Sequence, residues 1–126
     1  MRLLLDTHVV LWQLSGERSL GVRARELIGA STELAFSVVS FAEIGVKAAI
    51  GKLVVPDDLQ AHVARSGVRL LALLPEHGLA VASLPVHHRD PFDRLLVAQA
   101  RQGGFMLVTA DTRMHAYDVA VLDPLA

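Results

Sequence analysis

The sequence predicts an α/β fold, a three-layer α/β/α sandwich built on a mainly parallel sheet of about five strands. Two patterns support this prediction. Short aliphatic runs alternate along the chain with longer segments of helical periodicity, and strands separated by helices form βαβ units whose strands are parallel. Composition agrees, since 126 residues that are 52% hydrophobic and 20% charged describe a globular chain with one core. We therefore expect one domain over residues 1–126.

Each predicted strand is a short aliphatic run that stops at a polar or turn residue. RLLLD ends at Asp6, ELAFSVV contains β-branched residues, and FMLVT stops before Ala110 and Asp111. The expected strands are 2–6, 33–39, 68–73, 105–109 and 119–123.

The predicted helices lie between these strands and are bounded by capping residues, prolines and glycines. Ser19 is expected to cap a helix, and helical spacing resumes at Ser40 and stops at Gly51. Gly103 and Gly104 end the last helix. The expected helices cover about 9–14, 20–29, 40–50, 56–66, 75–85 and 91–102.

Charge and composition exclude several classes of protein. A formal net charge of −1 neither requires nor excludes a polyanionic partner, so any nucleic-acid site needs a local group of basic residues. The absence of cysteine excludes disulfides, thiolate metal sites and thiol catalysis. Asp6 interrupts the apolar N-terminal run, and no segment approaches the roughly 18 apolar residues of a membrane span. A cytoplasmic protein without a membrane partner is expected.

Acidic residues occur where predicted strands end and where the following helices begin. Asp6 ends the first strand, Glu43 lies in the first turn of the helix after the second, Asp93 opens a later helix, and Asp111 follows FMLVT. In a parallel sheet these positions share one edge, which is where ligands bind in such folds. The fold therefore predicts that four carboxylates from separate segments converge.

Each acid also has a local explanation. Ser40 and Glu43 have the spacing of a capping box, and Asp90 before Pro91 is typical of a helix N-cap. Asp93 would favour the positive end of the helix dipole, and the acids at the strand ends could be turn residues. We assign Asp90 mainly to capping and Asp93 mainly to chemistry.

Converging carboxylates repel one another and force at least one toward protonation, unless a cation joins them. Mg²⁺ and Mn²⁺ are hard ions that take oxygen ligands. Such an ion lowers the pKa of a bound water and screens the charge on a phosphate under attack. An acidic site without cysteine or clustered histidine therefore indicates phosphoryl chemistry with Mg²⁺ or Mn²⁺ as cofactor.

Four motifs carry a family resemblance: LLLDTHVVLW, SFAEIGVKAAIGKL, DPFDRLLVAQA and LVTAD, in that order over nearly the whole chain. With them the sequence resembles PIN-domain ribonucleases, and within that superfamily the VapC-type toxins of bacterial toxin–antitoxin pairs. LLLDTH and DPFDRLLVAQA together are the most specific part of the resemblance.

The resemblance implies that Asp6, Glu43, Asp93 and Asp111 are the catalytic and metal-binding acids. It implies endonucleolytic cleavage of RNA with Mg²⁺ or Mn²⁺, leaving a 5′-phosphate. It also implies a homodimer and a VapB-type antitoxin that covers the active-site groove. Some relatives carry a further acid shortly after the fourth one, whereas the next acid here is Asp118. The position of Asp111 is therefore the least secure of the four.

Basic residues near the acids have two interpretations. Lys47 follows Glu43 by four residues, which predicts an ion pair on one helix or, alternatively, a phosphate contact beside the metal. Arg89, Arg94 and Arg113 flank the acidic segments. They either supply local positive potential for RNA or are solvated surface charges.

Other polar and aromatic residues remain open between a structural and a functional role. Thr7 could bond a water on the metal or cap a helix. His87 and His88 would point in opposite directions on a strand and have no histidine partner at i+4, so metal ligation is not expected. Trp12 and its aliphatic neighbours belong to the core or form a surface for an antitoxin segment.

Two functions from different classes fit these residues. The first is a metal-dependent endoribonuclease toxin. The second is a non-catalytic PIN-like module that binds RNA or protein, which the presence of all four acids disfavours. Metal-dependent cleavage by the purified protein would discriminate between them.

Overall fold

The computed structural model describes residues 1–126 and contains one sheet of five parallel strands in the order β3-β2-β1-β4-β5. This confirms the predicted α/β class, and each predicted strand is present, although the structure trims several ends. The strands are β1 Arg2–Leu5, β2 Glu33–Ser37, β3 Arg69–Leu71, β4 Met106–Val108 and β5 Val121–Leu122.

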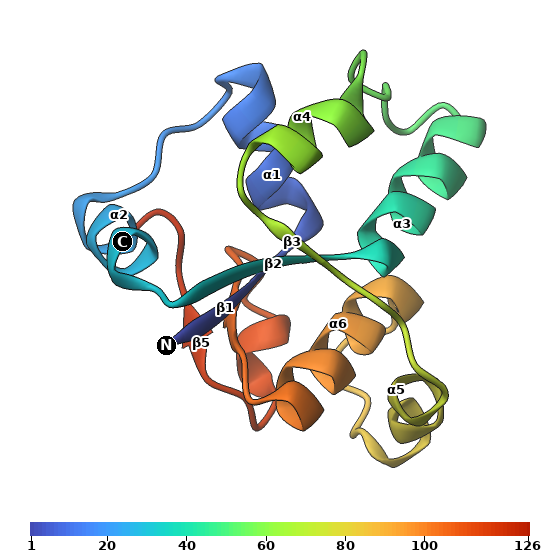
Figure 1. Cartoon of the computed structure of the whole chain (residues 1–126). Coiled ribbons are helices and arrows are strands. Elements are labelled where there is room, and N and C mark those ends of the chain that lie inside the picture. The colour runs from blue at the N-terminus through green and yellow to red at the C-terminus, as the bar shows by residue number, and fades with distance from the viewer.

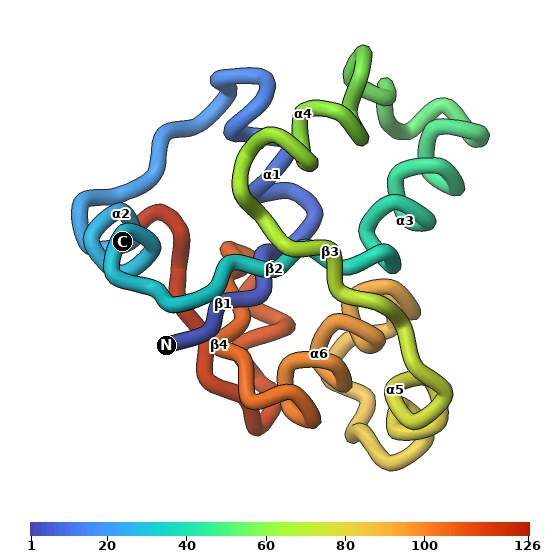
Figure 2. The backbone as a smooth tube through the Cα atoms, in the orientation of Figure 1, coloured from blue at the N-terminus to red at the C-terminus, as the bar shows by residue number.

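Six α-helices and two short 3₁₀ turns connect the strands, and the backbone trace in Figure 2 shows how the connections cross over the sheet. The helices are α1 Thr7–Ser15, α2 Val22–Ala30, α3 Val38–Ala49, α4 Leu59–Arg65, α5 Pro75–Ala80 and α6 Pro91–Gly103, with 3₁₀ turns η1 Val81–Ser83 and η2 Met114–Ala116.

Two hydrophobic clusters, one on each face of the sheet, hold the three layers together. Successive strand residues point to opposite faces, so Leu4 of β1 joins the cluster that packs against α6, whereas Leu3 and Leu5 join the cluster that packs against α1 and α4. Figure 1 shows α5 and α6 on one side of the strands and α1, α2 and α4 on the other.

The register of the central strand brings three chain segments to the same edge. Leu5 of β1 pairs with Phe36 of β2 on one side and with Val108 of β4 on the other. The residues that follow these three, among them Asp6, therefore emerge side by side at the carboxyl edge of the sheet.

Helix α3 begins earlier than predicted. Its N-cap is Ser37, whose hydroxyl accepts a hydrogen bond from the Val39 amide at 3.0 Å. Ser40 and Glu43 consequently lie inside the helix, both fully buried. The predicted capping box at Ser40 and Glu43 is wrong, because another serine three residues earlier performs the capping.

The predicted cap at Ser19 is also wrong. Helix α2 begins at Val22, and its N-cap is Gly21, which has no side chain to cap with. The C-terminal residues lie here instead: the Gly21 amide donates to Pro124 O at 3.0 Å, and the Ala24 amide approaches Ala126 O at 3.4 Å. Figure 1 shows the C-terminus beside α2.

Other helix boundaries differ less. Helix α1 begins at Thr7, directly after β1, and α4 begins only at Leu59 because Asp58 adopts a left-handed conformation. The segment predicted as one helix at 75–85 divides into α5 and η1. The end of α6 is as predicted, with Gly104 left-handed at φ 68°.

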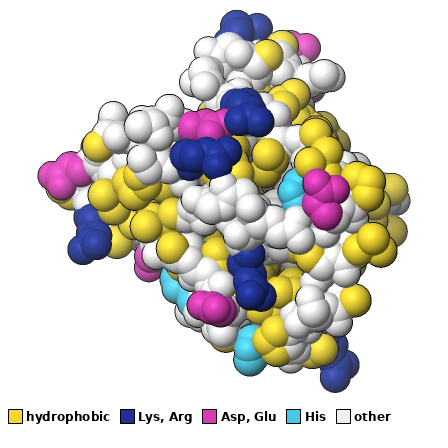
Figure 3. Space-filling view, turned by 60° about the horizontal axis from the view of Figure 1, so that its bottom comes forward, with side chains coloured by type: hydrophobic (Ala, Val, Ile, Leu, Met, Phe, Trp, Pro, Cys, Tyr) yellow, Lys and Arg dark blue, Asp and Glu magenta, His cyan; other side chains and the backbone are white.

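The outer surface has no field of a single charge on the face shown in Figure 3, where Lys, Arg, Asp and Glu side chains are dispersed among hydrophobic and neutral ones. None of the helices combines the length and the apolar character that crossing a membrane requires.

Candidate active site

Asp6 is positioned by the central strand. Its amide donates to Val108 O of β4 at 2.9 Å, and its Oδ2 accepts from the Thr109 hydroxyl at 2.7 Å. The side chain makes no capping hydrogen bond to α1, which removes the local explanation for this acid. Its second oxygen, Oδ1, is buried without any hydrogen-bond partner. A buried, unsatisfied carboxylate oxygen is costly unless something else binds it.

Glu43 points from the second turn of α3 toward Asp6 and is 1% exposed. Its Oε1 accepts from the Thr7 hydroxyl at 2.6 Å, and its Oε2 pairs with Lys47 Nζ. The predicted i,i+4 ion pair is therefore confirmed. Lys47 also lies 3.5 Å from Asp90 Oδ2, so it bridges α3 and the start of α6.

Asp90 caps α6 and Asp93 does not, as the sequence predicted. Asp90 Oδ1 accepts from the amides of Phe92 and Asp93 at 2.8 and 3.2 Å and caps α6. Asp93 makes no capping bond; its buried Oδ2 is hydrogen-bonded to His88 Nε2 at 2.7 Å.

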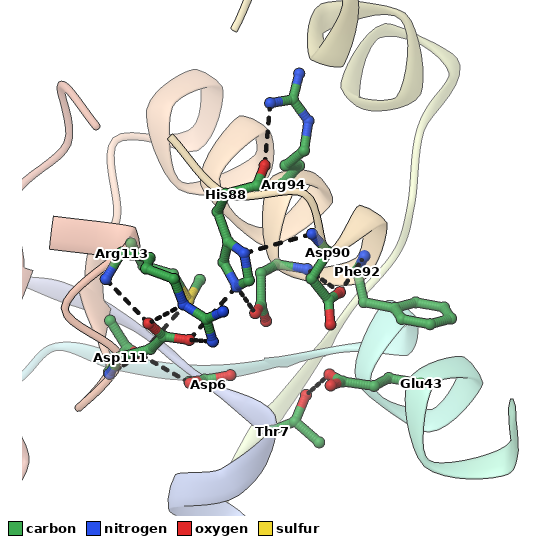
Figure 4. A network of polar contacts seen from close by, with 12 residues as sticks. Asp6, Thr7, Glu43, His88, Asp90, Phe92, Arg94, Asp111 and Arg113 are labelled. Carbon is green, nitrogen blue, oxygen red and sulfur yellow. Dashed lines mark hydrogen bonds and ion pairs between the residues drawn. The ribbon is translucent and has the colours of Figure 1, made fainter. Parts of the chain in front are cut away.

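These elements bring three acids together. One oxygen each from Asp6, Glu43 and Asp93 lies within 4.8 Å of the others, and all three residues are buried. Figure 4 shows the side chains of Asp6 and Glu43 reaching toward each other from different elements, with Asp90 above them. We call Asp6, Glu43 and Asp93 the acidic cluster.

Asp111 lies beside the acidic cluster rather than in it. It forms a second group with His88 and Asp93, again with ligand atoms within 4.8 Å. Its Oδ1 accepts from the Arg113 amide at 2.9 Å, which confirms a turn role, and its Oδ2 accepts from Arg113 Nη2 at 2.9 Å. From the sequence, Asp111 is the least secure of the four predicted metal-binding acids.

Burial and repulsion perturb the acids. Burial raises the pKa of Asp93 to about 8, and the negative charges of Asp6, Asp90, Glu43 and Asp111 add to the rise. Burial likewise raises the pKa of Asp6, although the hydrogen bond from Thr109 opposes this.

Asp111 is perturbed in the other direction. Its partial burial would raise its pKa, but the hydrogen bonds and charge of Arg113 outweigh this and hold the pKa of Asp111 below its ordinary value. Asp111, the most accessible of the four acids, is therefore held ionised by a counter-charge of its own, Arg113.

The acidic cluster fits a small divalent cation. Its donors are hard carboxylate oxygens, it contains the orphaned Oδ1 of Asp6, and its members repel one another without a compensating charge. Lys47 neutralises only the Glu43 side of the cluster.

His88 and Arg94, which flank the acids in sequence, make contacts that the sequence did not predict. His88, for which the sequence predicted only that it would not ligate a metal, is 6% exposed and touches Asp93 and Asp111. It was missed because it lies in the irregular turn before α6, where strand alternation gives no orientation. His87 next to it is exposed, although the two residues do not form the strand on which the opposite-facing prediction rested.

Arg94 is neither a solvated charge nor a phosphate contact. Its guanidinium lies between η1 and the turn that carries His88 and donates to five acceptors at 3.0–3.4 Å. These acceptors are Val81 O, Leu84 O, Pro85 O, His88 O and Tyr117 Oη.

The chain is similar to known proteins over most of its length. The PIN domain family model matches residues 3–120 of the chain. The chain is 30% identical over 122 residues to "Ribonuclease VapC22" of Mycobacterium tuberculosis, covering 90% of each protein.

Solved structures share the fold at lower identity. The chain resembles VapBC2 from Rickettsia felis bound to a promoter DNA fragment, with a TM-score of 0.72, 16% identity and coverage of 97% and 98% of the two chains. It also resembles DNA-bound VapBC from Salmonella typhimurium, with a TM-score of 0.69, 16% identity and 98% coverage of each chain.

Proposed function

We propose, because this chain belongs to the PIN domain family, that it is a metal-dependent endoribonuclease and the toxin of a toxin–antitoxin pair. The observation that carries the proposal is the convergence of Asp6, Glu43 and Asp93, with one buried Asp6 oxygen left without a partner. The similarity to a protein named as a ribonuclease supports RNA as the substrate.

Asp6, Glu43 and Asp93 would hold Mg²⁺ or Mn²⁺ directly or through water, and Asp111 would complete the site or orient the attacking water. When bound, the cation lowers the pKa of a coordinated water and stabilises the charge that develops on the phosphate. We expect hydrolysis of the P–O3′ bond, which leaves a 5′-phosphate.

The surrounding residues orient these acids. Thr109 donates to Asp6 Oδ2, and Thr7 donates to Glu43 Oε1, so each carboxylate keeps one oxygen in a defined direction. Lys47 offsets part of the negative charge at Glu43. Preorganised ligands of this kind avoid a rearrangement when the cation and the substrate bind.

Basic residues beside the acids support binding of a polyanion. A hollow of about 440 Å³ next to the acidic cluster has Arg89 and Arg113 in its lining. Both side chains are exposed, and Arg89 makes no ion pair. They supply the local positive potential that a net charge of −1 lacks.

An antitoxin of the VapB type is the proposed protein partner, since solved relatives are VapBC complexes. An apolar hollow of about 190 Å³ between α1, α2 and α4 offers a place for an aliphatic segment. Leu14 lines it and is 38% exposed, which agrees with the surface role considered for the region around Trp12. A short neighbouring reading frame with a DNA-binding N-terminus would support this partner.

A homodimer is proposed with it. Exposed aliphatic side chains occur at Val46 of α3 and at its C-cap Ile50, and around β3 at Leu70 and Leu73, and such residues are often covered in an assembly. We also propose a cytoplasmic location.

RNA cleavage by the purified protein tests the enzymatic proposal. We expect cleavage with Mg²⁺ or Mn²⁺ that stops in excess EDTA and in Asp6→Asn, whereas Asp57→Asn, in an exposed loop, keeps full activity. Full activity of Asp6→Asn, or activity in EDTA, would contradict the mechanism. RNA binding without cleavage would favour the alternative, a non-catalytic module.

A further inference from the structure

His88 is held rigidly by its backbone. Its amide donates to Tyr117 Oη at 3.1 Å, and its carbonyl accepts from Tyr117 Oη at 3.3 Å and from Arg94 Nη1 at 3.4 Å. Figure 4 shows its ring descending from this turn toward the carboxylates. The ring therefore enters the site from a fixed direction.

The hydrogen bonds of the ring identify its tautomer. Nδ1 lies 3.4 Å from the Asp90 amide nitrogen, which can only donate, so Nδ1 offers its lone pair. A neutral imidazole then carries its proton on Nε2. Nε2 lies 2.7 Å from Asp93 Oδ2 and 3.4 Å from Asp111 Oδ2, so its N–H is directed at two carboxylates from different elements.

We propose that His88 is a positioning residue, whose Nε2–H ties Asp93 of α6 to Asp111 of the loop after β4, and that it is not a ligand of the cation. The inference rests on the proposed function, since it concerns how the same acids are arranged. It assigns His88 a role toward the metal site that the acids alone do not reveal.

Two features favour a donor over a ligand. Ligation through Nε2 would move the ring proton to Nδ1 and place it against the Asp90 amide, beside the residue that caps α6. An Nε2–H directed at two carboxylates also holds both of them in place, whereas a nitrogen bound to the cation could hydrogen-bond neither.

The orientation that His88 provides should appear in metal affinity, measured by calorimetry with Mn²⁺ in the absence of RNA. We expect His88→Leu to weaken binding about 10-fold, as removal of a residue that orients a metal ligand typically does. His88→Gln, whose amide can donate near the Nε2 position, should recover most of the loss.

His87→Leu is the matched control, because the neighbouring histidine is exposed and contacts none of the acids. It should bind Mn²⁺ like the wild type. Thermal unfolding of each metal-free variant shows whether it is folded. If His88→Leu does not fold, the comparison of His88→Gln with the wild type and the spectra below decide the question.

Nitrogen-15 NMR of the wild-type imidazoles gives a readout that a purely structural role would not move. We expect the Nε2–H tautomer of His88 both without metal and after addition of Mg²⁺. Conversion to Nδ1–H on adding Mg²⁺ would show direct ligation and overturn the inference. Wild-type Mn²⁺ affinity in folded His88→Leu, or equal losses in His88→Leu and His88→Gln, would overturn it as well.

Failure of the inference about His88 can be distinguished from failure of the proposed nuclease function. Affinity and tautomer are measured without RNA, so a protein that binds Mn²⁺ through this arrangement and cleaves no RNA would refute the nuclease and keep the inference. Failure of the wild type to bind Mg²⁺ or Mn²⁺ at all would overturn both.

Discussion

The hydroxyl of Thr7 lies 2.6 Å from Glu43 Oε1 and 2.8 Å from Ser40 Oγ, and so joins the start of α1 to the middle of α3. An ionised carboxylate can only accept, so Thr7 donates to Glu43 and accepts from Ser40. From the sequence alone, Thr7 could either cap a helix or hydrogen-bond a water on the metal. The structure instead gives it the task of orienting a carboxylate.

Replacing Thr7 with valine removes this donor at nearly constant volume. We expect Thr7→Val to lose about 10-fold in Mn²⁺ affinity and about 2 kcal/mol in the free energy of unfolding, because a buried carboxylate oxygen loses its partner. Thr7→Ser keeps the hydroxyl and should bind the ion normally. Calorimetry and urea unfolding check both, and unchanged affinity in Thr7→Val would show that Glu43 needs no such support.

The raised pKa of Asp93 predicts how stability depends on pH in the metal-free protein. The pKa rises from 3.8 to about 8 on folding. Over that window Asp93 holds a proton in the folded protein but not in the unfolded chain. Asp93 therefore makes the free energy of unfolding fall as pH increases, by at most about 1.4 kcal/mol per pH unit, and the raised pKa of Asp6 acts in the same direction.

Urea titrations in EDTA across this range measure the slope. Asp93→Asn should flatten it and should be more stable than the wild type near pH 8, since it removes a charge repelled by its neighbours. Asp57→Asn should keep the wild-type slope. Stability that rises with pH over this window would contradict the assignment.

Cation binding should release a proton from Asp93 at neutral pH. A bound divalent ion favours the charged carboxylate, whereas the metal-free site favours the protonated one. Calorimetric titrations of Mg²⁺ in buffers of different ionisation enthalpy count the protons released. We expect close to one for the wild type near pH 7 and none for the same titration well above pH 8.

Arg94 should be important for stability although it touches none of the acids. Four of its five hydrogen bonds satisfy carbonyls between η1 and the His88 turn, and the fifth is to Tyr117 Oη. We expect Arg94→Met to lower the free energy of unfolding by about 3 kcal/mol, because these acceptors lose a charged donor. Arg101→Met, at an exposed site of α6, should change it by less than about 0.5 kcal/mol in chemical denaturation.

Gly21, the N-cap of α2, and Gly29, inside α2, can be compared directly. A Cβ at Gly21 would lie 1.7 Å from Ala126 O, whereas one at Gly29 meets nothing within 4 Å. Gly21→Ala should therefore displace the C-terminal residues and destabilise the protein by about 1–3 kcal/mol. Gly29→Ala should stabilise it by about 0.5–1 kcal/mol. Thermal unfolding of the two variants distinguishes local crowding from a general effect of alanine.

The parts of the fold that follow from local pattern were predictable. The five strands are aliphatic runs between polar residues, and the cap of α6 follows from Asp90 and Pro91, which act on adjacent backbone groups. The edge position of the acids follows from parallel topology. None of these predictions needed a contact between distant residues.

The features that the sequence did not predict depend on contacts between distant residues. Ser37 and Ser40 can both cap a helix, and only the packing that buries Ser40 against Thr7 decides between them. The start of α2 depends on the far end of the chain. His88 lies in a turn without periodicity, and its partner Asp111 comes from another element, so no spacing rule connects them.

The four acids come in equal numbers from the two halves of the chain. Asp6 and Glu43 precede the largely exposed segment 51–58, whereas Asp93 and Asp111 follow it. A cut in this segment would give two pieces that each carry two of these four acids, and neither could assemble the cluster of three. The proposed RNA hydrolysis would return only when the two pieces reassociate. The chain is therefore suited to a split reporter, in which activity measures the association of the two pieces.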